Sequence, residues 1–225
     1  CRVNTFSIVR NISNLRLSGF TKDLLVVTGD SGNLVILNFN NEKSTFERMY
    51  SEPFGKSGCR RIVPGHYLAV DPLGRSIMIG AIERQKLVYT LTRRNKEQDS
   101  LEISSPMEAH KSHMICFSMV PLDVGFDNPI YATLEEEYCA DDNKDSTKKG
   151  KQLIFWEVDL GLNYVSRKCS HKVSDTSHLL ITVPGGNDGP SGVLVCDYRG
   201  VTYSKMGHES IYCPYPVSYT HLRAH

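Results

Sequence analysis

The chain has 225 residues, of which 40% are hydrophobic and 23% charged, and this composition is typical of a globular protein and excludes disorder throughout. The formal net charge of +1 disfavours a surface whose main task is to neutralise nucleic-acid phosphates, because such proteins carry a clear basic excess. No apolar run approaches the roughly 18 residues that a membrane-spanning helix needs, so we expect no contact with a membrane.

The start of the chain carries no secretory signal. It begins at Cys1 instead of Met, and the next residues lack a basic stretch followed by an apolar core. We expect an intracellular protein. Of a processed precursor and a truncated reading frame, we favour the truncated frame.

The hydrophobic pattern predicts short β-strands joined by turns, because apolar residues rarely recur at the spacing of an amphipathic helix. Glycine-rich or proline-containing turns are expected at 28–33 and 71–75. The strands expected in the first half of the chain are 24–27, 34–39, 67–70, 76–82 and 86–91. Those expected in the second half are 114–120, 130–134, 153–158, 179–183, 193–196 and 201–203.

The turns indicate a repeat. Gly32 and Gly74 lie 42 residues apart, within the range of about 40 to 50 residues for a four-stranded propeller blade. The Trp-Asp dipeptide of the best-known propeller repeat is absent, and Glu157 follows the single tryptophan, Trp156. We predict an all-β, WD40-like β-propeller that is incomplete, with residues 1–216 supplying about four to five blades of an N-terminal propeller.

Two features interrupt the strand pattern. Residues 135–152 are polar and charged, and we interpret them as a long solvated loop between two strands, with a partner-docking loop as the alternative. Trp156 is expected to be a half-buried aromatic side chain of a strand and not a platform for nucleic-acid bases.

No motif predicts catalysis. Gly55-Lys56-Ser57 lacks the earlier glycine of a phosphate-binding loop, since Tyr50 stands there, and no helix is predicted after it. Ser31 lies in a sequence like the nucleophile segment of trypsin-like proteases, but no supporting base is evident, so we interpret it as a turn residue. The glycine-rich segment 184–192 is also expected to form turns. We therefore predict no enzyme and no cofactor; an enzyme that uses Ser31 or the Lys56 loop is the competing hypothesis.

The metal-binding residue types are scattered. The seven cysteines include no C-x-x-C pair, which favours free thiols. His110 and His113 are three residues apart, but no carboxylate completes a site. We predict no metal site.

The densest basic cluster in a segment that should be ordered consists of Lys56, Arg60 and Arg61. These residues are our candidates for partner binding through an acidic protein surface. A solvated loop and a direct RNA contact are the alternatives.

Several segments resemble one known family in the same order along the chain. They are 54–65, 69–72 with 74–75, 83–89, 103–106, 123–126, 159–163 and 180–192. They resemble the first propeller of the large β-propeller subunit of splicing factor 3b, over about residues 5 to 213. The turn Asp71-Pro72-x-Gly74-Arg75 is similar to the wider superfamily, which also contains the DNA damage-binding adaptor and the large subunit of the cleavage and polyadenylation specificity factor.

The resemblance implies a nuclear protein with three propellers and a C-terminal helical part, of which this chain is part of the first propeller. It implies a non-enzymatic scaffold of the splicing factor 3b complex in the U2 small nuclear ribonucleoprotein, which supports branch-site recognition in pre-mRNA splicing. The implied partners are a helical-repeat subunit and a very small subunit, with nucleic acid reached indirectly through the complex. An adaptor of the damage-binding or polyadenylation type is the alternative.

The tail departs from the family pattern. Residues 217–225 resemble a translated sequencing adapter, and we exclude them from the predicted fold.

Overall fold

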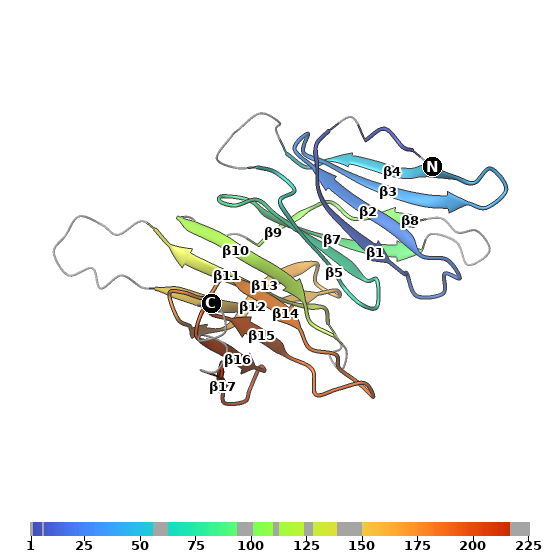
Figure 1. Cartoon of the computed structure of the whole chain (residues 1–225). Coiled ribbons are helices and arrows are strands. Elements are labelled where there is room, and N and C mark those ends of the chain that lie inside the picture. The colour runs from blue at the N-terminus through green and yellow to red at the C-terminus, as the bar shows by residue number, and fades with distance from the viewer. Residues whose placement is uncertain are drawn as a thin grey trace, which may run out of the picture.

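The computed structural model describes residues 2–5, 7–55, 63–93, 101–109, 113–123, 128–138 and 150–216. Within these ranges the regular structure is entirely strand, arranged in four antiparallel sheets (Figure 1). The predicted all-β class is therefore confirmed. Among the described residues there is no helix long and apolar enough to cross a membrane.

The first two sheets are built by the N-terminal half of the chain. The first sheet consists of β1 (Val9–Leu15), β2 (Leu24–Gly29), β3 (Asn33–Asn40) and β4 (Thr45–Pro53). The second sheet consists of β5 (Tyr67–Val70), β6 (Ser76–Gly80), β7 (Lys86–Arg93), β8 (Leu101–Ile103) and the short β9 (Met107–Glu108), which also pairs with β7.

The C-terminal half forms two further sheets of four strands each. The third sheet consists of β10 (Met114–Pro121), β11 (Ile130–Glu137), β12 (Lys151–Asp159) and β13 (Tyr164–Lys172). The fourth sheet consists of β14 (Leu179–Thr182), β15 (Val193–Cys196), β16 (Gly200–Ser204) and β17 (Ile211–Pro214).

The sheets follow one another in chain order. Apart from β9, successive strands of each sheet pair with their chain neighbours. The first strand of each sheet contacts the first strand of the next: β1 with β5, β5 with β10, and β10 with β14. The first sheet and the third and fourth sheets therefore lie on opposite sides of the second in Figure 1. Sheets joined through their first strands in this way are the blades of a propeller.

Alternating residues of one strand enter different apolar cores. Leu68 and Val70 of β5 belong to the core between the first and second sheets, whereas Ala69 between them belongs to the core between the second and third sheets. This two-residue period places apolar side chains on both faces of the second sheet.

The fourth sheet is covered on one face. Leu180, Val193 and Val195 are buried in the core that this sheet shares with the third sheet. On the other face Leu179 and Ile181 are 44% and 45% exposed. The described part of the stack therefore ends in an open apolar face.

The prediction of a solvated loop over residues 135–152 is wrong at both ends. Glu135 pairs with Gln152 between β11 and β12, and the side chain of Glu135 is 0% exposed. The strands extend into this polar stretch because Glu135 has a cation to pair with inside the protein. Residues 139–149, the middle of the predicted loop, lie outside the described residues.

That cation is Lys86 of β7, in the neighbouring sheet. Its ammonium group donates to Glu135 Oε1, and the Lys86 side chain is 5% exposed. The same ammonium lies 4.5 Å from the centroid of the Trp156 ring, and Trp156 Nε1 donates to Thr133 Oγ1 at 2.8 Å. Trp156 is thus buried rather than half-buried, because it covers an ion pair between two sheets.

We expect Glu135→Ala to destabilise the protein by about 3–5 kcal/mol, because it leaves the Lys86 ammonium buried without its carboxylate. The double variant Lys86→Met, Glu135→Leu should recover most of this loss, since it removes both charges. The denaturant midpoint measures the effect. Glu47→Ala, which removes the exposed partner of Lys43, serves as the control and should change the midpoint little. A midpoint for Glu135→Ala equal to that of the control would contradict the role of the pair.

Candidate protein-docking surfaces

Apart from β8 and β9, which both pair with β7, each strand within a sheet is antiparallel to the next, so the connections between strands alternate between the two ends of the sheets. One end carries the β1–β2 loop and the β5–β6 turn. The opposite end carries the β2–β3 turn and the connection from β4 to β5, which includes the predicted partner-binding residues.

Lys56, Arg60 and Arg61 lie outside the described residues, within the gap 56–62. The residues that precede the gap are firmly held. Gly32 O accepts hydrogen bonds from Phe54 N at 2.7 Å and Gly55 N at 3.2 Å. The side chain of Gln85 donates from Nε2 to Phe54 O at 2.8 Å, so the second sheet also holds this segment.

The residues that follow the gap return to the same place. Thr28 Oγ1 donates to Gly65 O at 2.9 Å, and both groups are buried. Gly65 has a φ of +71°, and a Cβ there would lie 3.1 Å from Gly29 N. Both ends of the connection that carries the basic residues are therefore attached to the β2–β3 end of the first sheet.

The β2–β3 turn itself does not form a catalytic arrangement. Ser31 Oγ is buried without a hydrogen-bond partner. The Asp30 carboxylate accepts from Arg10 Nη2 at 2.8 Å, and this contact lowers the pKa of Asp30. Burial lowers the pKa of His66. Among the described residues Ser31 therefore lacks the hydrogen bond to a base that would activate a serine nucleophile.

The described cysteines and histidines form no cluster. Among the described residues no group of three or more histidine, cysteine, aspartate or glutamate side chains gathers as a metal site would require. The described cysteines are free thiols: Cys116, Cys169, Cys196 and Cys213. Burial raises the pKa of the Cys116 thiol to about 12, which keeps it protonated and unreactive.

At the other end of the sheets, the β5–β6 turn is closed by one buried carboxylate. Asp71 accepts hydrogen bonds from Arg75 N at 3.1 Å, Arg75 Nε at 2.8 Å and Arg75 Nη2 at 3.1 Å. Gly74 N donates to Asp71 O at 2.7 Å. Proline after the aspartate and glycine at the left-handed position are the residues that such a turn requires. The turn predicted at 71–75 is confirmed.

Gly74 also allows this turn to lie in close contact with the β1–β2 loop of the first sheet. Its φ is +69°, and a Cβ on Gly74 would lie 2.1 Å from the backbone oxygen of Arg16 in the β1–β2 loop. A clash with backbone is not relieved by rotating a side chain. Glycine is therefore required here for two reasons, the backbone conformation and the close approach of the neighbouring loop.

We expect Gly74→Ala to destabilise the protein more than Gly207→Ala. Gly207 has a φ of +79° with nothing within 4 Å of its Cβ position, so alanine there adds conformational strain alone, about 1–2 kcal/mol. At Gly74 the clash with Arg16 adds to that strain. Thermal unfolding of both variants measures the difference. Equal melting temperatures would show that the contact between the β5–β6 turn and the β1–β2 loop does not contribute to stability.

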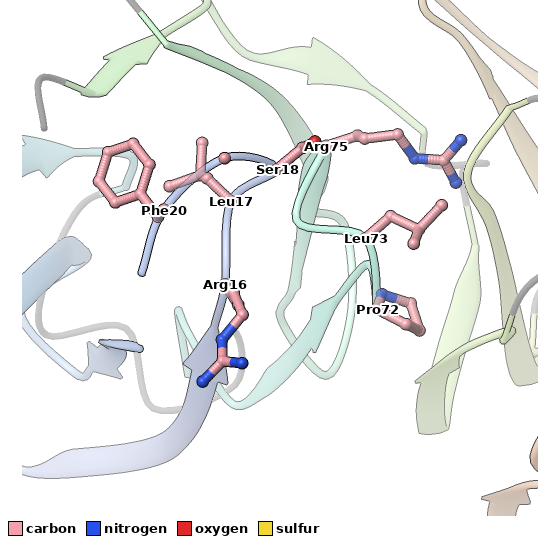
Figure 2. A pocket seen from close by; sticks show the side chains of 8 residues that line it. Arg16, Leu17, Ser18, Phe20, Pro72, Leu73 and Arg75 are labelled. Atoms are coloured by element: carbon pink, nitrogen blue, oxygen red, sulfur yellow. The ribbon is translucent and has the colours of Figure 1, made fainter. Parts of the chain in front are cut away.

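The β1–β2 loop and the β5–β6 turn border an open hollow of about 340 Å³. Figure 2 shows Leu17 and Phe20 on the β1–β2 loop and Pro72 and Leu73 on the β5–β6 turn, with the side chains of the two pairs pointing away from each other. No pattern in residues 16–20 predicted this hollow. The Asp-Pro-x-Gly-Arg turn was recognised, but its contact with a loop more than fifty residues earlier depends on how the sheets stack.

A similar contact joins the third and fourth sheets. Asp123 Oδ2 accepts from Gly185 N at 3.0 Å, and the Asp123 backbone oxygen accepts from Ser191 Oγ at 3.2 Å. Tyr203 donates from its hydroxyl to Ser191 O at 2.7 Å. The glycine-rich segment 184–192 is thus a folded loop, as predicted, that is attached to the preceding sheet.

Comparison with known proteins identifies the family. The model of the RSE1/DDB1/CPSF1 first beta-propeller matches residues 1–223. The chain belongs to this family. Stacked antiparallel sheets joined through their first strands are what membership predicts, and the propeller assignment made from the turn spacing is confirmed.

Curated relatives that are identical to this chain at about half of the aligned residues carry splicing names. Spliceosome-associated protein 130 A of Arabidopsis thaliana is 52% identical over 93% of the chain. Splicing factor 3B subunit 3 of Drosophila melanogaster is 51% identical over 94%, and Pre-mRNA-splicing factor prp12 of Schizosaccharomyces pombe is 50% identical over 90%. The resemblance to the large splicing factor 3b subunit is therefore confirmed. The chain spans about 17% of the length of each of these relatives.

Proposed function

We propose that this chain is part of a non-enzymatic scaffold of the splicing factor 3b complex in the U2 small nuclear ribonucleoprotein, where it supports branch-site recognition in pre-mRNA splicing. The observation that carries the proposal is identity of about 50% over nearly the whole chain to proteins named for splicing. The relatives' names favour this role over an adaptor of the damage-binding or polyadenylation type, although the family description includes both.

The fold supports a binding role. Short connections attached to neighbouring sheets, such as the β5–β6 turn, present side chains in fixed positions, which lowers the entropy lost when a partner binds. We infer that the chain catalyses no reaction, acts in the nucleus and binds other subunits of the complex, namely the helical-repeat subunit and the small subunit. Its association with RNA is indirect, through the complex.

Affinity purification tests this function. The full-length protein that contains this sequence, purified from nuclear extract, should recover the other splicing factor 3b subunits. Recovery of ubiquitin-ligase or polyadenylation components in their place would contradict the proposed function. The control is the reverse experiment: purification of another splicing factor 3b subunit from the same extract should recover this protein.

We also propose that Lys56, Arg60 and Arg61 bind an acidic surface of a protein partner. Two features support it: their density of positive charge and the attachment of both flanking segments to the first sheet. Replacing all three by Glu should reduce recovery of one subunit at least tenfold, because opposite charges across an interface become like charges. The same change at exposed Arg167, Lys172 and Arg199 is the control and should leave recovery unchanged.

The salt dependence of RNA binding distinguishes a direct RNA contact from a protein contact. If these three residues contact RNA directly, the full-length protein should bind a single-stranded RNA oligonucleotide with an affinity that falls steeply as salt rises, and the Glu variant should lose both the affinity and the slope. That result, together with unchanged recovery of the subunits, would contradict the protein-partner proposal.

A further inference from the structure

We propose that the turn between β12 and β13 is a protein-docking site, whose Leu162 and Tyr164 side chains insert into an apolar concave surface of another subunit of the complex. This inference rests on the proposed function, since it assigns a surface and a partner chemistry to the scaffold. The β12–β13 turn belongs to the third sheet and is separate from Lys56, Arg60 and Arg61, which precede β5.

The β12–β13 turn exposes two large apolar side chains. Leu162 is 78% exposed, the highest value of any large apolar side chain among the residues that the structure describes, and Tyr164 is 62% exposed. Residues 160–165 include no charged side chain. These two side chains therefore offer a partner apolar area to bury, and tyrosine is enriched among the residues that dominate binding energy at interfaces.

A missing neighbour in the stack of sheets does not explain this exposure. The third sheet already has an apolar core on each face, with Val158 in the core shared with the second sheet and Phe155 in the core shared with the fourth. Leu179, in contrast, is exposed on the face of the fourth sheet that has no described neighbour. Leu162 and Tyr164 stay exposed although both neighbouring sheets are in place.

The equivalent turn of the first sheet has the same backbone arrangement. Both turns join the third and fourth strands of a four-stranded sheet. Asn40 Oδ1 accepts hydrogen bonds from the backbone N–H groups two and three residues later, at 3.0 and 3.2 Å. Asp159 Oδ1 accepts the two corresponding bonds in the third sheet, both at 2.9 Å. Ser44 and Asn163 then adopt φ angles of +50° and +49°.

The turn geometry therefore does not require the apolar side chains. Leu162 occupies the position that Lys43 has in the first sheet, and Tyr164 occupies the position of Thr45. Polar residues are the usual choice in such turns, because their side chains stay in water. Since the polar set forms the same turn, the exposed leucine and tyrosine have no evident structural purpose, and this favours a role in binding.

Contacts at the base of the β12–β13 turn hold its backbone in place. Besides the two bonds to Asp159, Leu160 N donates to Asn128 Oδ1 at 3.4 Å, and Asn128 Nδ2 donates to Glu157 Oε1 at 3.0 Å. The Leu160 side chain packs against the core between the second and third sheets. A turn that is already ordered loses little backbone entropy when a partner binds.

The chemistry of the turn favours an apolar protein surface over nucleic acid. Residues 160–165 offer no cation to a phosphate, and the Asp159 carboxylate beside them would repel one. Lys168, on the neighbouring strand, is already paired with Glu157. The side chains protrude from a convex turn, so the complementary surface is concave. That surface is also uncharged, because a charged group buried against Leu162 would lose its hydration.

Site-specific photocross-linking in the full-length protein, assembled with the other splicing factor 3b subunits, tests where the turn binds. A benzoylphenylalanine that replaces Tyr164 should cross-link to another subunit, at a segment rich in large apolar residues. Mass spectrometry maps the product. The same probe in place of Thr45, at the equivalent position of the first sheet, is the matched control and should not yield that product.

Exchange of residues between the two turns tests the side chains. The variant Leu162→Lys, Tyr164→Thr carries the residues of the first-sheet turn, so its melting temperature should be unchanged. Its affinity for the cross-linked subunit should fall at least tenfold, because the apolar side chains are gone. Leu162→Met keeps a large apolar side chain and should retain the affinity. Lys43→Ala, in the polar turn, is the control and should leave the affinity unchanged.

The inference fails if position 164 cross-links no more than position 45, or if the product is RNA, a second copy of this chain or another part of the same polypeptide. It also fails if the exchanged variant binds as tightly as the unchanged protein, if its melting temperature falls together with its affinity, or if Leu162→Met loses as much affinity. In each of these cases the unchanged full-length protein can still recover the other splicing factor 3b subunits. Loss of that recovery would overturn the proposed function and this inference together.

Discussion

The structure depends on burial of apolar side chains between consecutive sheets. Each core is built from two sheets that are neighbours in the chain, and the second and third sheets supply side chains to a core on each face. A single four-stranded sheet cannot shelter its own apolar residues, so each sheet is stable through its neighbours. The buried pair of Lys86 and Glu135 is charged and not apolar, but it also joins two adjacent sheets.

This arrangement determines where binding surfaces can form. The faces of the second and third sheets are filled by cores, so these sheets are accessible to partners mainly at their connections. Those connections are fixed by backbone contacts between sheets, such as Gly74 against Arg16 and Asp123 against Gly185. A surface built from two rigid connections of different sheets can have a definite shape, although neither connection has one alone.

The features that the sequence predicted correctly were local ones, namely strands and turns. Alternation of apolar residues predicted the strands that contain Leu68 and Leu153, and glycine and proline predicted the turns at 28–33 and 71–75. Burial of Glu135 was missed because its partner, Lys86, lies in another sheet, and polar sequence normally indicates solvent exposure. The hollow was missed for the same reason. Lys56, Arg60 and Arg61 remain a prediction, since they lie outside the described residues.

Stacking in chain order has a consequence for synthesis of the protein on the ribosome. Each sheet pairs its strands locally and then packs on the sheet made just before it, so structure can accumulate in the order of translation. At every stage the newest sheet has a face that its next neighbour has not yet covered. The nascent chain is therefore most vulnerable to aggregation at its growing end, where chaperones bind exposed apolar strands.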